Sequence, residues 1–111
     1  MDKLNRYRHI IRELIQRYAQ YQPACGEVQS EVILDETNDH YELMYAGWND
    51  PYRIHGSMLH IDIRQEKAWI QYDGTEDGIA EELVKAGISH DRIVLAFKPS
   101  DIRAHTDFAV A

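Results

Sequence analysis

Histidine and carboxylate side chains are the groups in this chain that could bind a metal ion or move protons. His60 and Asp62 lie two positions apart in a segment of alternating side chains, so in a strand they would share one face. His40, in the preceding segment, and His55 are also expected within cross-strand reach of that face. Such side chains are suitable ligands for zinc or iron. The spacing places no further ligand, so the simpler interpretation is a solvated sheet face with a His60–Asp62 hydrogen bond and no bound metal or cofactor.

An acidic segment further along could bind a divalent cation or supply paired carboxylates for acid–base chemistry. Its acids are Asp73, Glu76, Asp77, Glu81 and Glu82. Their spacing matches no EF-hand loop, and the helix dipole alone explains acids in the first turn of a helix. Two glycines precede that helix, but the Lys-Ser/Thr pair of a phosphate-binding loop is missing. We expect this segment to have a structural role.

Cys25 is the single cysteine, which excludes a disulfide framework and a multi-cysteine metal site. It could be a nucleophile only with a base beside it, and a single cysteine in a turn more often has no chemical role. The first residues are charged and no long apolar segment exists. We therefore expect one cytoplasmic domain over residues 1–111 that contacts no membrane, with no catalytic residues.

The chain is acidic, and its charge is unevenly distributed. It has 12 lysines and arginines against 19 aspartates and glutamates, which argues against nonspecific DNA binding by the whole surface. Residues 1–22 nevertheless hold five basic and two acidic side chains. Those cations divide between the two sides of a predicted helix, with Arg8 and Arg12 on one side and the others towards the opposite side. We interpret them as solvated flanks and do not expect direct DNA binding.

The spacing of apolar residues predicts an α+β fold. A stripe with helical period runs through residues 2–22 and consists of Leu4, Tyr7, Ile11, Leu14, Ile15 and Tyr18. Segments typical of strands follow at 27–36, 40–48, 52–64 and 67–72, joined by short turns. They predict a four-stranded antiparallel meander with one face packed against helices. In the third strand, Leu59, Ile61 and Ile63 would share the core face, and Gly56 suggests a bulge or a close backbone approach.

Residues 69–97 predict a strand, an acidic turn, a short amphipathic helix and a fifth short strand. Thr75 is the expected N-cap of the helix, and Gly87 is the expected left-handed C-cap. Its buried stripe would contain Ile79, Ala80, Leu83 and Val84. Residues 93–97 are expected to form the compact fifth strand, Pro99 is expected to open one more helical turn through Arg103, and the apolar tail is expected to be packed.

Aromatic side chains are concentrated in the predicted sheet. They are Tyr41, Tyr45, Trp48, Tyr52, Trp69 and Tyr72. Part of this aromatic area should lie on the face that the helices do not cover, where it would mark a protein contact surface. We therefore predict that Trp48, Tyr52 and Trp69 bind a partner, and we expect the protein to form a homodimer.

Several stretches closely resemble the XisI-like family of cyanobacterial proteins, named for a factor that controls excision of the fdxN DNA element. The most specific is WIQYDGTEDGIAEELVKAGISHDRIVLAFKPSDIRAHTDFAVA, from Trp69 to the end. The opening LNRYRHIIRELIQRYAQYQPACGEV and the middle stretches DETNDHYELMYAGWND and RIHGSMLHIDI agree as well. The main departure is Arg64-Gln65-Glu66-Lys67, where a glycine-containing hairpin turn would be expected.

The resemblance implies a small, oligomeric α+β protein that works beside a XisH-type partner. In the founding system such proteins help a site-specific recombinase to remove a DNA element, so any recombinase contact of this chain would be indirect. The family supplies no catalytic residues to carry over. We therefore expect a noncatalytic controlling factor. The alternative is a small ligand-binding or metal-binding domain, or an enzyme, that uses the face with His40, His55, His60 and Asp62.

Overall fold

The structure is a computed structural model, and it describes residues 2–21, 23 and 26–111. Cys25, considered above as a nucleophile, lies outside the described residues. The elements are helix α1 (Lys3–Ala19), strands β1 (Glu27–Asp35), β2 (His40–Asn49), β3 (Tyr52–Arg64) and β4 (Lys67–Asp73), helix α2 (Ala80–Ala86), strand β5 (Ile93–Leu95) and helix α3 (Ser100–Arg103). A short 3-10 turn at His90–Arg92 precedes β5.

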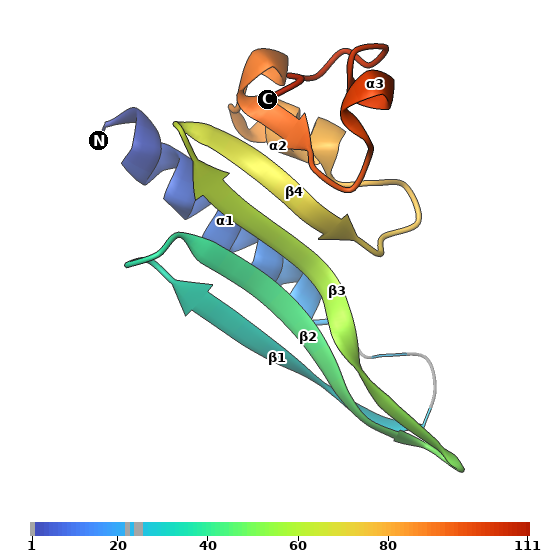
Figure 1. Cartoon of the computed structure of the whole chain (residues 1–111). Coiled ribbons are helices and arrows are strands. Elements are labelled where there is room, and N and C mark those ends of the chain that lie inside the picture. Colours follow the sequence, from blue (N-terminus) through green and yellow to red (C-terminus); the bar gives the residue numbers. More distant parts are fainter. Residues whose placement is uncertain (1, 22, 24–25) are drawn as a thin grey trace.

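The strands form one five-stranded sheet in the order β1-β2-β3-β4-β5 (Figure 1). The first four are antiparallel neighbours, and β5 adds to β4 in parallel, which confirms the predicted α+β fold with its meander and fifth strand. β3 has the predicted bounds. β5 ends at Leu95 rather than at Phe97, whose side chain is exposed, and α1 ends at Ala19, three residues before the predicted end.

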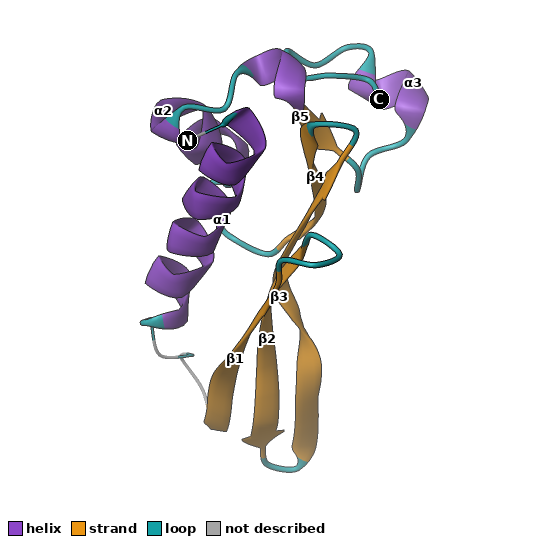
Figure 2. Ribbon diagram, turned by 90° about the vertical axis from the view of Figure 1, so that its left-hand side faces the viewer, coloured by secondary structure: helices purple, strands orange, loops and turns teal. Residues whose placement is uncertain are grey.

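Helices α1 and α2 cover one side of the sheet (Figures 1 and 2). The stripe of α1 buries Tyr7, Ile11, Leu14 and Ile15, and α2 adds Leu83 to the same core cluster. The sheet contributes apolar residues at alternate positions, among them Leu43, Leu59, Ile61 and Ile70. Burying each side chain of this size contributes roughly 2 kcal/mol, so this one layer supplies most of the driving force for folding.

The opposite side of the sheet, which we call the open face, carries no helix over β1, β2 and β3 in the described part of the chain (Figure 2). Strand register assigns to it the odd-numbered residues 27–35 of β1 and the even-numbered residues 40–48 of β2. From the next two strands it includes Arg53, His55, His60, Asp62, Arg64, Trp69 and Gln71. This face is therefore available for binding.

The loop before α2 differs from the prediction, because Thr75 does not cap the helix. The N-cap position is Ile79, which makes no side-chain capping bond. The carboxylate of Asp73 replaces the expected cap: it accepts hydrogen bonds from the backbone N–H of Ile79 at 2.8 Å and of Thr75 at 3.0 Å. Gly78, with φ at 82°, turns the chain so that Asp73 can reach the helix start. The expected C-cap Gly87 is confirmed, with φ at 124°.

The predicted bulge or close backbone approach at Gly56 is wrong. A Cβ atom at Gly56 would meet nothing within 4 Å. The irregularity between β2 and β3 lies further along, because Leu43 pairs with Leu59 whereas Met44 pairs with Ser57. Met58 is therefore the additional residue.

The C-terminal segment packs against the body of the protein, as expected. The N–H of Ala109 donates to the carbonyl of Ile93 at 2.9 Å, and Arg103 Nη1 donates to the carbonyl of Val110 at 3.0 Å. None of the described helices is long and apolar enough to cross a membrane.

Candidate functional site

Three of the four residues predicted to do chemistry meet on the open face. His40 begins β2 directly opposite Asp62 of β3, and His60 lies two residues before Asp62 on the same side of that strand. One potential ligand atom of each residue, a ring nitrogen of His40 and of His60 and a carboxylate oxygen of Asp62, lies within 4.8 Å of the other two. We call these three residues the His–Asp cluster.

Both histidines hydrogen-bond to one oxygen of Asp62. His40 Nδ1 and His60 Nε2 each lie 2.8 Å from Oδ1. A carboxylate only accepts hydrogen bonds, so both ring nitrogens carry protons in this arrangement. The other oxygen, Oδ2, accepts from Arg64 Nη2 and from Gln71 Nε2, each at 3.3 Å. Asp62 is thus a buried anion surrounded by donors from three strands.

The expectation of a solvated face is wrong at its centre, because Asp62 is only 1% exposed. The longer side chains of its hydrogen-bond partners enclose it. A buried carboxylate is costly unless its oxygens are hydrogen-bonded, and here donors reach both oxygens. The hydrogen bond to Asp62 also raises the pKa of the His40 imidazole above its ordinary value, because the negative charge favours the protonated ring.

His55 does not join the cluster. It pairs with Ala46, whereas His60 pairs with Glu42, further along both strands. Five positions separate His55 from His60, and at about 3.3 Å per residue this places them roughly 16 Å apart. The prediction that His55 lies within reach is therefore wrong, since both histidines belong to the same extended strand.

Arg64 and Gln71 hydrogen-bond to the cluster through Asp62, and neither was predicted from the sequence. Arg64 follows Asp62 at the period of a strand and so shares its face, a signal that the alternation alone provides. Gln71 is harder to find. β3 and β4 shift register between His60 and Ile61, and this shift leaves Gln71 without a directly opposed partner.

The three predicted partner-binding aromatic residues do not form one patch. Trp48 is 50% exposed on the open face, with the Arg53 guanidinium 5.5 Å from its ring centroid. Trp69 lies opposite Asp62 near the other end of that face, and its Nε1 donates to the carbonyl of Arg64 at 3.1 Å. Tyr52 is 68% exposed, but it pairs with Asn49 and so points to the other side of the sheet.

Acidic and apolar side chains share the open face near β1. Glu27, Glu31, Asp35 and Glu42 lie on it, and Ile33, 45% exposed, is placed among them directly opposite Glu42. The basic side chains of the face, Arg53, Arg64 and Lys67, all lie on β3 and β4, where Lys67 pairs with Arg64. On β1 and β2 this face therefore carries four carboxylates and no lysine or arginine.

The cations of α1 are largely paired within the protein. Arg8 bonds to Asp39 in the β1–β2 turn, Arg12 to Glu36 in the same turn, and Arg17 to Glu82 of α2. Burial and the hydrogen bond to Glu82 raise the pKa of the Tyr18 hydroxyl to about 12. The positive excess of the first 22 residues is thus compensated by acids from other elements.

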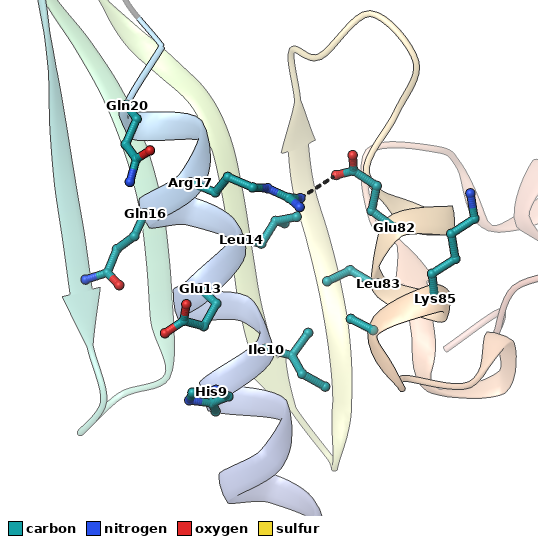
Figure 3. A pocket seen from close by; sticks show the side chains of 11 residues that line it. His9, Ile10, Glu13, Leu14, Gln16, Arg17, Gln20, Glu82, Leu83 and Lys85 are labelled. Carbon is teal, nitrogen blue, oxygen red and sulfur yellow. Dashed lines mark hydrogen bonds and ion pairs between the residues drawn. The ribbon is translucent and has the colours of Figure 1, made fainter.

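A groove of about 860 Å³ lies between α1 and α2 (Figure 3). Ile10, Leu14 and Leu83 contribute its apolar lining, and the Arg17–Glu82 ion pair spans it. Gln16 and Gln20 point away from α2, so the polar groups do not converge on a common point (Figure 3). Across the described residues, the only triad of potential metal ligands remains the His–Asp cluster.

The acidic segment has the structural role expected for it. Asp73 organises the loop before α2, and Glu82 accepts from the Tyr18 hydroxyl at 3.0 and 3.1 Å. Glu81 faces His90 of the 3-10 turn, with 3.6 Å between Oε1 and Nε2. These acids therefore serve separate contacts.

Two crystal structures from Anabaena variabilis are similar to this chain over almost its whole length. A XisI-like protein is 34% identical, has a TM-score of 0.91, and is matched over 97% of this chain and 99% of its own. The fdxN element excision controlling factor XisI is 35% identical, has a TM-score of 0.87, and is matched over 99% of this chain and 100% of its own. No curated protein sequence matched the chain.

The family model described as XisI protein matches residues 1–110. This match and the two structures confirm the resemblance to the XisI-like family. The chain belongs to the XisI family.

Proposed function

We propose that this protein is a noncatalytic controlling factor for the excision of a DNA element, and that it acts by binding a XisH-type protein. The observation that carries the proposal is the full-length similarity to a structure named as the fdxN element excision controlling factor. In this role the protein works in the cytoplasm as a homodimer, and any site-specific recombinase is reached through the partner.

The charge of the open face supports a basic partner surface. On β1 and β2 this face carries four carboxylates, Glu27, Glu31, Asp35 and Glu42, and no lysine or arginine, and Ile33 and Trp48 add exposed apolar area there. Interfaces of this kind combine aromatic contacts with complementary potentials, which accelerate association and exclude wrong partners. A DNA-binding protein presents the matching positive surface.

The ion pairs of α1 support action through a protein rather than through direct DNA contact. A helix that neutralises phosphates needs free cations along one face. Here Arg8, Arg12 and Arg17 are each held by a carboxylate of another element. Breaking three ion pairs to bind phosphate would offset much of the electrostatic gain.

Solution mass by light scattering tests the proposal. The protein is measured alone and mixed with a XisH-type protein encoded beside it, at about 0.05 and 0.5 M salt, because charge complementarity is screened by ions. A defined hetero-complex that weakens at the higher salt supports the proposal. Two unshifted peaks at both salt concentrations would overturn it. In a separate DNA-binding assay, this protein should shift a DNA duplex only when the XisH-type partner is present, which would support the indirect role.

A further inference from the structure

We propose that His40, His60 and Asp62 bind one divalent transition-metal ion, with zinc as the best match. The proposal is independent of the partner-binding role, because it rests on the geometry of the His–Asp cluster alone. Two imidazoles and one carboxylate form a donor set that zinc uses in proteins. Of the described residues, these three alone bring that set together.

The three ligand atoms already point at a common region. His40 Nδ1 from β2 and His60 Nε2 from β3 each lie 2.8 Å from Asp62 Oδ1. One potential ligand atom of each residue lies within 4.8 Å of the other two. Around tetrahedral zinc, with metal–ligand distances of about 2.0–2.2 Å, ligand atoms are roughly 3–3.5 Å apart. Small rotations of the imidazoles would therefore suffice to admit the ion.

Metal binding exchanges two N–H donors for two metal bonds. The proton on His40 Nδ1 and that on His60 Nε2 leave these atoms, and each ring keeps or gains a proton on its other nitrogen. For His60 that nitrogen, Nδ1, lies 3.9 Å from Glu42 Oε2, which is too long for a hydrogen bond. A small shift of either side chain would let this carboxylate hold the ring in the ligating tautomer. For His40 the ring is 47% exposed, so solvent can accept the other N–H.

The two oxygens of Asp62 have different surroundings, which suits a carboxylate that binds a metal through one oxygen while the other accepts hydrogen bonds. Oδ1 faces the histidines, whereas Oδ2 accepts from Arg64 and Gln71 at 3.3 Å. Carboxylate ligands are commonly held by such outer hydrogen bonds. The Arg64 charge opposes a cation, but its side chain is 57% exposed and therefore partly screened by solvent.

The cluster is open on one side. Asp62 is buried, while the side chains of His40 and His60 are 47% and 31% exposed. Three protein ligands leave one tetrahedral position for a water molecule or another exchangeable ligand, as in sites that are not purely structural. This position would face the solvent from the open face of the sheet.

Cobalt and zinc titrations of tag-free, chelator-treated protein test the proposal. Co²⁺ in a tetrahedral site gives strong visible absorption, and Zn²⁺ then displaces it. We expect one equivalent to bind. His40→Ala and His60→Ala should each weaken binding at least tenfold, and His55→Ala, on the same strand and face as His60 but outside the cluster, should leave it unchanged.

A second measurement separates loss of a ligand from loss of the fold. Circular dichroism should show His40→Ala folded, since that side chain is nearly half exposed. Zinc should raise the melting temperature of the wild type and of His55→Ala but not of His40→Ala. Failure to bind one equivalent would overturn the proposal, and so would binding of equal strength in wild type, His40→Ala and His60→Ala.

Discussion

The guanidinium of Arg8 in α1 is joined to the carboxylate of Asp39 in the β1–β2 turn by two hydrogen bonds, of 2.8 and 3.1 Å. The Tyr41 hydroxyl donates to the same carboxylate at 2.8 Å. A two-point contact of this kind fixes orientation as well as distance. It therefore holds the β1–β2 turn against α1 and fixes the position of that end of the sheet relative to the helix.

We expect Arg8→Ala to reduce stability at neutral pH and to flatten its dependence on acid. The hydrogen bond from Arg8 lowers the pKa of Asp39, against the opposing effect of burial. A carboxyl with a depressed folded pKa stabilises the protein above its unfolded pKa and loses that contribution as the pH falls through the folded value. Urea unfolding should therefore show the wild type approaching Arg8→Ala below about pH 4.

Lys3→Ala provides the control for this variant, because Lys3 is a cation of the same helix that forms no ion pair within the described residues. Its unfolding free energy should run parallel to that of the wild type from pH 7 to pH 3. If the curves of Arg8→Ala and the wild type were themselves parallel, the pair would contribute nothing that depends on Asp39 ionisation.

Glu66→Gly should stabilise the protein by about 1 kcal/mol, the order of the strain at one left-handed position. Gln65 and Glu66 form the β3–β4 turn with φ values of 52° and 62°, a geometry that two-residue hairpins usually fill with Asn-Gly. Thermal unfolding measures the gain. Glu76→Gly, in an exposed loop without a positive φ, should give no such increase, and an equal increase in both variants would contradict the explanation.

Much of the sheet could be predicted because its signals are local. β3 alternates core and open-face residues along its second half, so Leu59, Ile61 and Ile63 were assigned to the core and are buried. The turn at residues 64–67 lacks the glycine expected from related sequences. Even so, the chain keeps the hairpin by adopting left-handed geometry at Gln65 and Glu66. Strand pairing thus outweighs the preference of the turn residues.

The candidate site could be predicted only in part, because its decisive contacts are not local. His40 and Asp62 are 22 residues apart, and their contact depends on the register of β2 and β3. That register includes an additional residue at Met58, which no periodicity indicates. The burial of Asp62 depends further on Gln71, whose position follows from a second irregularity. Bulges are set by the neighbouring strand, so a single strand cannot reveal them.

Asp73→Ala should destabilise the protein by about 1–2 kcal/mol, the range for losing a helix-capping side chain. Its carboxylate satisfies the backbone N–H groups of Ile79 and Thr75 and accepts from the Thr75 hydroxyl. Asp and Thr are both good caps by residue type, so residue type alone could not show that Asp73 rather than Thr75 has this role. Thermal unfolding of Asp73→Ala, compared with that of exposed Asp77→Ala as control, measures the contribution of the Asp73 carboxylate. A loss as large in Asp77→Ala would mean that negative charge near the helix, rather than capping, is responsible.

Trp48→Ala should weaken the complex with a XisH-type protein by about 2 kcal/mol, roughly thirtyfold, and leave the fold intact. Trp48 is half exposed on the open face, where its loss removes contact area and the Arg53 contact but no core packing.

Tyr52→Ala is the matched control, since Tyr52 is a similarly exposed aromatic residue of the same hairpin that points to the other side of the sheet. Trp69→Ala discriminates less well, because Trp69 also hydrogen-bonds to Arg64 beside the His–Asp cluster. Titration by calorimetry gives the three affinities. Weaker binding in Tyr52→Ala than in Trp48→Ala would move the partner to the helix-covered side, and equal affinity in all variants would exclude these aromatic residues from the interface.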